Sequence, residues 1–402
     1  MINTSVSTST NVPARLSPDQ LAHDLAVPDL TDPDEGAHAV QLVLNRVVQA
    51  LAARWGCEVR WHRGTRIVPV ADNYDLLGYD PADVTRDARY TRYVDERRML
   101  RSHSSALIPA ALRALAQEAA TGQCPDDVLL VCPGVVYRRD AIDRLHTGTP
   151  HQLDLWRIRR GAPLGEADLR DMVATIVDTL LPGAEHALDP RVHPYTLNGQ
   201  QVDVRTPAAE PKRNNTGRPG NGEWVEVAEC GLTHPKVLAH ADLDGSYSGL
   251  ALGMGLDRLL MLIKGVPDIR LLRAADPRIA GQMRDLSPYR AVSALPPVRR
   301  DLSVAVDAGD LAEDLGDRVR DALGPDAARV EAVEILSRTP CAKLPPVARD
   351  RLGARPDQDN LLVRIVLRDL DRTLTDHDAN VLRDRIYAAV HKGTVHQWAV
   401  DI

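Results

Sequence analysis

The sequence predicts an α+β protein in which an antiparallel sheet flanked by helices is followed by a smaller α/β sandwich. Three observations lead to this fold class. Apolar residues recur at helical spacing in long segments, with short strand-like segments between them. No Gly-x-Gly-x-x-Gly motif follows a first strand and no Walker loop occurs, which disfavours a doubly wound parallel sheet. The composition changes near Leu286-Ser287-Pro288, and Pro296-Pro297 marks the start of a separate unit.

The first unit begins with an amphipathic helix that Gly56 ends, with apolar residues on one face at Ala37, Val40, Leu42, Val43, Val47 and Leu51. The following elements are predicted in order: a strand over 65–70, loop and short helix over 73–96, a helix over 104–119, strands over 128–132, 135–137 and 153–158, and a helix over 165–182. The last helix opens with acidic residues and closes before Pro182-Gly183.

The second half of the chain continues with strands and then repeats helices and strands on a smaller scale. Residues 207–222 are dense in Pro, Gly and Asn, which predicts an exposed loop. Strands over 224–230 and 248–254 lead into a helix over 255–264. The second unit has strands over 301–306, 330–337 and 360–368 and helices over 311–323 and 376–391. This βαββα order predicts a sandwich of ferredoxin type.

Length and composition are those of an ordinary soluble protein of two or three domains, with 402 residues, 44% hydrophobic residues and a net charge of −7. We expect a disordered tail over 1–34, one domain over 35–286 and another over 287–402. The tail lacks the apolar stretch of a signal peptide, and no apolar run reaches the roughly 18 residues of a membrane span. A cytoplasmic protein is expected. The cysteines show no Cys-x-x-Cys spacing, which argues against a structural zinc site.

The segment from Gly249 to Met261 carries the strongest functional signal. Gly249, Gly253 and Gly255 would let a buried strand run against a ligand with no side chain in the way, and Arg258 follows where the chain turns helical. Small residues that merely pack a helix on a strand are the alternative interpretation.

A second motif, Val136-Tyr137-Arg138-Arg139-Asp140, places an arginine at a strand end with an acid two residues on. Such a strand end is often only solvated. An arginine is also the side chain best suited to an α-phosphate on which charge develops.

Taken in order, and with Lys264 to Arg270 downstream, these segments resemble motifs 2 and 3 of class II aminoacyl-tRNA synthetases, and specifically phenylalanyl-tRNA synthetase catalytic chains. Pro297 to Leu302 and Arg372 to Thr375 resemble the ferredoxin-like anticodon-binding domain of single-chain, organelle-type enzymes of that family. The resemblance covers about residues 35–402. It implies the class II catalytic fold, ATP and Mg²⁺ as cofactors, and an amino acid and tRNA as partners.

The resemblance also implies site residues. For ATP these are Arg138, Asp140, His146, Pro150, Gly255 and Arg258, with Arg138 on the α-phosphate and Arg258 stacked on adenine. Pro150 stands where the family has an aromatic residue. For the amino acid they are His103, Ser105, Gln152, Asp154, His193, Tyr195, Glu229, Cys230, Ala251 and Gly253. Asp154 replaces a glutamate, His193 and Tyr195 replace the usual aromatic pair, and Glu229 stands at a position that is commonly glycine. No metal ligands are assigned.

Apart from Pro150, the departures from the family concern the amino acid, so phenylalanine, tyrosine, a substituted phenylalanine and a non-protein amino acid remain open. The acceptor is also open. Arg299, Arg300, Arg364, Arg368 and Arg372 could form a tRNA-binding face, although residues 290–402 carry 17 basic against 19 acidic side chains. A paralogue that delivers its adenylate to a carrier protein or small molecule, and a non-catalytic sensor, are the rival functions. Both a monomer and a homodimer fit the sequence.

Overall fold

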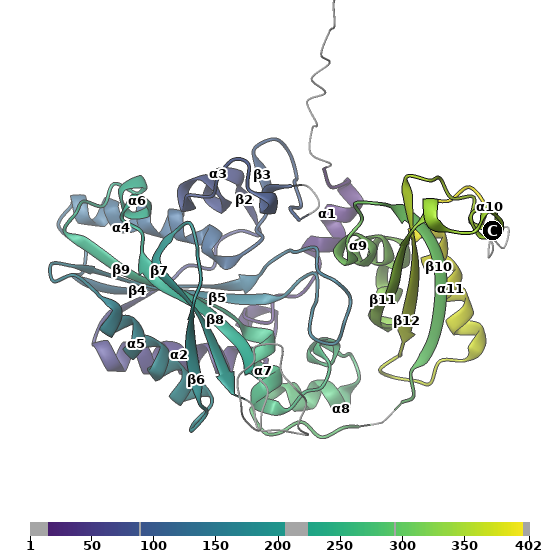
Figure 1. Cartoon of the computed structure of the whole chain (residues 1–402). Coiled ribbons are helices and arrows are strands. Elements are labelled where there is room, and N and C mark those ends of the chain that lie inside the picture. The colour runs from purple at the N-terminus through teal and green to yellow at the C-terminus, as the bar shows by residue number, and fades with distance from the viewer. Residues whose placement is uncertain (1–14, 88–89, 206–223, 293–294, 397–402) are drawn as a thin grey trace, which may run out of the picture.

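The computed structural model describes residues 15–87, 90–205, 224–292 and 295–396. Its largest feature is a seven-stranded sheet in the order β1-β4-β5-β9-β8-β7-β6 (Figure 1). The β1–β4 pair is parallel, and the other five pairs are antiparallel. The strands are β1 (Glu58–Trp61), β4 (Asp127–Val135), β5 (His151–Arg160), β6 (His186–Pro190), β7 (Thr196–Arg205), β8 (Trp224–Thr233) and β9 (Tyr247–Gly255). The predicted α+β class, with an antiparallel sheet flanked by helices, is confirmed.

Helices cover both faces of this sheet because successive side chains of a strand point to opposite faces. Leu153 and Leu155 of β5 pack into a core with α2 (Ala39–Trp55), α5 (Glu166–Leu180) and α7 (Leu256–Lys264). Trp156 and Ile158 of the same strand pack into a second core with α4 (Ile108–Ala120) and α6 (Pro235–His240). The short helix α3 (Val70–Asn73) and the antiparallel pair of strands β2 (Ile67–Pro69) and β3 (Arg98–Leu100) lie on this second face.

A smaller sheet follows, with the antiparallel order β10-β12-β11. Its strands are β10 (Val298–Asp307), β11 (Val330–Pro340) and β12 (Gln358–Leu367). Helices α9 (Ala312–Leu323) and α11 (Asp376–Val390) bury one face of it, and α10 (Pro346–Leu352) lies between β11 and β12 in the chain. The predicted βαββα order is therefore present, with one additional short helix.

The start of the chain differs from the prediction. Residues 15–34, expected within a disordered tail, are folded, whereas residues 1–14 lie outside the described part. Helix α1 (Pro18–Leu25) begins with a capping box between Ser17 and Gln20, and Asp24 at its end is buried against Arg92 at 2.7 Å. Sequence reasoning missed this segment because its ordering comes from residues distant in the chain.

Other differences are local. The strand predicted over 128–132 is part of β4, which passes through Gly134 at a φ of 146° and ends at Val135, so residues 136 and 137 of the strand predicted over 135–137 lie beyond it. Strand β7 was not predicted, because Asn198-Gly199-Gln200 interrupts its apolar alternation. The predicted loop over 207–222 lies outside the described residues.

The segment joining β4 to β5, residues 136–150, contacts the second unit. Ile142 is buried among the apolar residues of the smaller sheet, and its carbonyl accepts a hydrogen bond from Val333 N at 2.9 Å. Arg139 pairs with Asp317 of α9 at 2.8 Å. The two units therefore meet at the loop that carries Arg138 and His146.

Candidate active site

The two arginines singled out in the sequence come to the same edge of the large sheet. Gln152, near the start of β5, pairs with Gly134 of β4 on one side and with Gly255 of β9 on the other. Arg138 follows the end of β4, and Arg258 lies in the first turn of α7 directly after β9. Three neighbouring strands thus bring both guanidinium-bearing segments to one place.

The glycines of β9 have different roles. A Cβ atom on Gly249 would lie 2.6 Å from Thr233 Oγ1, so this glycine serves close packing. A Cβ on Gly255 would meet nothing within 4 Å, and one on Gly253 would meet only the Asp154 carboxyl group, at 3.6 Å or more. Packing therefore explains Gly249, whereas Gly253 and Gly255 form a floor that no neighbouring side chain closely covers.

Arg138 lies beside this floor. Its Nε donates a hydrogen bond to the Ser102 carbonyl at 2.9 Å, and its side chain is exposed. Burial raises the pKa of Asp140, and the nearby charges of Arg138 and His146 oppose that rise. The hydrogen bond that His146 Nδ1 donates to Asp143 raises the pKa of His146, and the charge of Arg258 opposes this rise. His146 thus lies within electrostatic reach of Arg258, and Asp140 within that of Arg138.

A buried pair fixes the edge on which these residues lie. The backbone N–H of His151 donates to Asp257 Oδ2, and its Nδ1 lies 2.9 Å from Asp257 Oδ1. Although burial opposes it, the His151 charge and hydrogen bond hold the pKa of Asp257 below its usual range. Because His151 precedes Gln152 and Asp257 precedes Arg258, this pair sets the position of two predicted ligand-binding residues.

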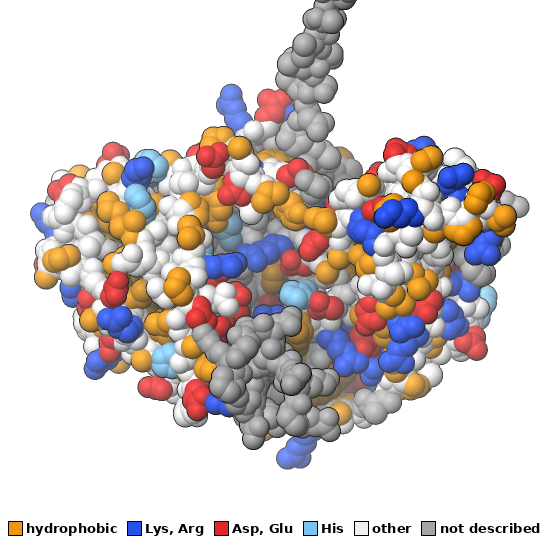
Figure 2. All heavy atoms as spheres, viewed as in Figure 1, with side chains coloured by type: hydrophobic (Ala, Val, Ile, Leu, Met, Phe, Trp, Pro, Cys, Tyr) orange, Lys and Arg blue, Asp and Glu red, His pale blue; other side chains and the backbone are white. Residues whose placement is uncertain are grey.

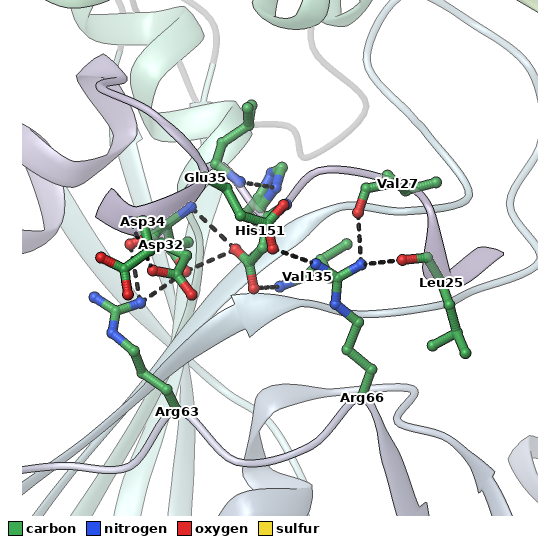
Figure 3. Close-up of polar contacts among 12 residues, drawn as sticks. Leu25, Val27, Asp32, Asp34, Glu35, Arg63, Arg66, Val135 and His151 are labelled. Atoms are coloured by element: carbon green, nitrogen blue, oxygen red, sulfur yellow. Dashed lines mark hydrogen bonds and ion pairs between the residues drawn. The ribbon is translucent and has the colours of Figure 1, made fainter. Parts of the chain in front are cut away.

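The N-terminal segment braces the same edge (Figure 3). Leu30 N donates to His151 Nε2 at 3.0 Å, and Val135 N donates to Asp29 Oδ2 at 3.0 Å. Arg66 holds the segment through the carbonyls of Leu25 and Val27, at 2.8 and 2.6 Å. These residues carried no motif, so the sequence alone gave no signal for them.

Asp154 forms the centre of the predicted amino-acid site. It is buried, and it accepts hydrogen bonds from Ser104 Oγ, from Ser105 Oγ at 2.9 Å and from Trp156 Nε1 at 3.2 Å. Burial raises its pKa, while these three donors act in the opposite direction. Gln152 Oε1 accepts from Ser104 N at 3.2 Å. The predicted group Ser105, Gln152 and Asp154 is thus brought together.

Aromatic rings surround this centre. Tyr195 stacks on Trp156 with ring centroids 5.9 Å apart and on His193 at 5.7 Å, and Tyr79 stacks on His103 at 5.7 Å. Burial, with a smaller effect of Arg138, lowers the pKa of His103 to about 3, so this ring is neutral at physiological pH. Sequence reasoning missed Tyr79, which lies in a segment predicted as loop and short helix.

The positions of three further predicted residues, Cys230, Ala251 and Pro150, can be compared with the prediction. Cys230 was expected to line the amino-acid site but packs on the opposite face of β8, in the core with α2, α5 and α7. Ala251 faces the correct side and packs near Trp156. The Pro150 carbonyl accepts a hydrogen bond from Val136 N at 2.8 Å, which anchors the joining segment.

The predicted tRNA-binding arginines do not share one face. Arg299 and Arg364 lie on the sheet face away from α9 and α11, whereas Arg300 reaches Asp376 of α11 at 2.9 Å. Arg364 pairs with Asp301 at 2.8 Å and Arg372 with Asp378 at 2.9 Å. Arg368 pairs with Glu331.

A cleft of about 800 Å³ lies between the two units (Figure 2). It is lined by basic and acidic side chains, including Arg92, Arg320 and Asp321, and it reaches His146 and Asp257. Of the predicted site residues, His146 lines this cleft, whereas Arg138 and Arg258 are not among its lining residues. No helix among the described residues has the length and apolar character needed to cross a membrane.

Residues 22–283 match the family model of the tRNA synthetases class II core domain (F). The chain belongs to this family. It is 30% identical over 280 residues to the phenylalanine–tRNA ligase alpha subunit of Chromohalobacter salexigens, covering 67% of this chain and 75% of the relative. The corresponding subunit of Hamiltonella defensa is 28% identical over 263 residues, covering 65% and 72%. That of Staphylococcus carnosus is 33% identical over 214 residues, covering 53% and 58%.

Membership of the family confirms the predicted fold and the predicted enzyme class, an aminoacyl-tRNA ligase. The match ends at residue 283 and so does not extend to the smaller sheet.

Proposed function

We propose that this protein uses ATP to activate an aromatic amino acid, phenylalanine or a ring-substituted analogue, as an aminoacyl-adenylate and then transfers the acyl group to tRNA. One observation carries the proposal. The Gly134, Gln152 and Gly255 register brings Arg138, the buried Asp154 and Arg258 around an open glycine floor. The aromatic class follows from the relatives, which are phenylalanine–tRNA ligase alpha subunits.

The first step needs position and charge rather than a general base. The substrate carboxylate attacks the α-phosphorus of ATP and pyrophosphate leaves, so negative charge builds on the α-phosphate oxygens. Arg138, exposed beside the floor, would offset this charge, and Arg258 would hold adenine by stacking its planar guanidinium on the base.

Asp154 would bind the α-ammonium group. A carboxylate held by Ser104, Ser105 and Trp156 has three neutral donors around it but no direct cationic partner among the described residues. A buried charge of this kind is stabilised when a cation joins it. The ammonium group of an amino acid supplies that cation, and His103 and Tyr195 lie close enough to line the same space.

Mg²⁺ would add positive charge at the phosphates of ATP. Among the described residues, no three or more His, Cys, Asp or Glu side chains are arranged to hold a metal. We therefore propose that phosphate oxygens supply most of its ligands, as is usual for Mg²⁺.

The second unit, residues 287–402, is proposed as an anticodon-binding domain, and the whole chain as a single-chain enzyme of the cytoplasm, monomeric or homodimeric. The ion pairs of Arg300, Arg364 and Arg372 with acids leave less positive charge for RNA and favour the second candidate, a paralogue with a carrier protein or small-molecule acceptor.

Pyrophosphate exchange with each amino acid, followed by tRNA charging, separates these functions. Exchange and charging with an aromatic amino acid support the proposal. Exchange without charging of any tRNA would favour the paralogue, and silence with every amino acid would leave the sensor.

A further inference from the structure

Glu229 faces the open floor from the side opposite to Asp154. Asp154 of β5 pairs with Gly253 of β9, and Gly253 pairs with Glu229 of β8. Because neighbouring strands lie about 4.8 Å apart, the two acidic residues are separated by about 10 Å, with only a glycine between them. A ligand over Gly253 therefore has one carboxylate on each side.

Glu229 is held in place as an anion. His193 Nε2 lies 2.9 Å from its Oε2, and Arg191 Nε donates to its Oε1 at 3.1 Å. These partners keep the pKa of Glu229 below its usual range although burial opposes them. A carboxylate oxygen has two lone pairs, so each oxygen of Glu229 can accept one more hydrogen bond.

The backbone around His193 is shaped for this contact. A Cβ on Gly199 would lie 2.3 Å from the Arg191 carbonyl and 3.0 Å from His193 Nδ1, so only glycine lets the segment approach so closely. His193 stacks on Tyr195, and Tyr195 stacks on Trp156 at the far side of the floor. The Glu229 wall is thus joined through stacked rings to the Asp154 wall.

We propose that Glu229, with His193, selects an aromatic amino acid whose ring carries a hydrogen-bond donor, such as a hydroxyl or amino group, over phenylalanine. The inference rests on the proposed function, because it assumes that Asp154 takes the α-ammonium group. The Glu229 side chain is 30% exposed without a ligand, so water can bind its carboxylate. An unsubstituted ring over Gly253 would displace this water and put carbon atoms, which donate no hydrogen bond, in its place. A ring donor would replace that water with a hydrogen bond.

The test is pyrophosphate exchange by the full chain with phenylalanine, tyrosine, 3-hydroxyphenylalanine, 4-aminophenylalanine and 4-methylphenylalanine. The methyl and amino compounds have nearly the same shape, so their comparison isolates the hydrogen bond. We expect kcat/KM for the best donor-bearing compound to exceed those for phenylalanine and 4-methylphenylalanine by at least about tenfold.

Glu229→Gln should reduce this preference at least about tenfold, and Glu229→Gly should make the enzyme favour phenylalanine. Glu185→Gln is the matched control, because Glu185 pairs with Arg205 at 2.7 Å away from the floor. Its selectivity should equal that of the unaltered chain. If a Glu229 variant fails to fold, as judged by circular dichroism, the amino and methyl comparison in the unaltered chain still decides.

The outcomes are distinct. If phenylalanine or 4-methylphenylalanine is activated as well as every donor-bearing compound, or if folded Glu229 variants keep the original preference, this inference is overturned while the ligase function stands. Silence with all aromatic amino acids would overturn the proposed function together with it.

Discussion

Replacing Asp29 tests whether the N-terminal segment is part of the catalytic domain. Asp29 is 8% exposed, and its carboxylate accepts hydrogen bonds from Val135 N at 3.0 Å, Thr31 N at 3.0 Å and Thr31 Oγ1 at 2.7 Å. It also lies 3.6 Å from the guanidinium of Arg101, which is 1% exposed. Asp29→Ala would leave this buried cation without its carboxylate partner.

Breaking a buried ion pair by removing one partner costs about 3–5 kcal/mol. We therefore expect Asp29→Ala to reduce the free energy of unfolding by about 3 kcal/mol or more. For a domain of this size, that corresponds to a fall in Tm of roughly 6–12 °C. Asp29→Asn keeps an acceptor but removes the charge, so we expect a smaller loss of about 1–3 kcal/mol.

Urea unfolding followed by circular dichroism and tryptophan fluorescence measures these losses. Asp34→Asn is the matched control: Asp34 is exposed on the same segment, and its loss should change stability by less than about 0.5 kcal/mol. Removing residues 1–31 should destabilise the domain more than Asp29→Ala does. The reasoning fails if Asp29→Ala changes the free energy of unfolding no more than Asp34→Asn.

Three other substitutions test the site and the contact between units. Arg138→Ala should lower the rate of pyrophosphate exchange by about 10²–10³-fold with little change in stability, whereas Arg299→Ala should leave that rate unchanged. Equal exchange rates for the two variants would refute the phosphate role of Arg138. The pKa of His103 is about 3 in the folded chain and about 6.5 in the unfolded chain. The contribution of neutral His103 to the free energy of unfolding is therefore fully present above pH 6.5. It falls by up to about 1.4 kcal/mol per pH unit between pH 6.5 and 3. Urea unfolding at pH 7.0 and 5.5 should show this slope, and His103→Asn should reduce it. Ile142→Ala should lower the free energy of unfolding of the second unit by about 2–4 kcal/mol, measured from its calorimetric transition. Leu145 lies on the same segment and is 49% exposed, so Leu145→Ala should leave that transition in place.

Strand alternation explains both a success and an error of the sequence analysis. Gly249, Gly253 and Gly255 were predicted to let a strand run against a ligand. Gly253 and Gly255 are two residues apart and so share the face of the open floor, whereas Gly249 is closely packed. Glu229 and Cys230 are adjacent, so a strand cannot point both at one ligand. The family resemblance identified the segment, but only the alternation separates Glu229, on the floor side, from Cys230, in the core.

Contacts between distant segments limited the rest of the prediction. Tyr79 and Asp29 lie in stretches without helical or strand periodicity, and their partners are His103 and Val135. No local pattern encodes such pairs, because their free energy comes from burial and contacts between segments that are distant in the chain. The elements were therefore predicted better than the residues that hold them at the site.

The two consecutive arginines that follow β4 show why charge alone could not assign the site. Extended backbone sends neighbouring side chains in opposite directions. Arg138 turns toward the Ser102 carbonyl beside the floor, while Arg139 pairs with Asp317 of the second unit. An Arg-Arg-Asp sequence predicts two equivalent solvated cations, yet Arg138 lies beside the floor and Arg139 contacts the second unit. The segment that presents Arg138 is thus held by the second unit through Arg139 and Ile142, so the geometry of the proposed phosphate site depends on contacts with that unit.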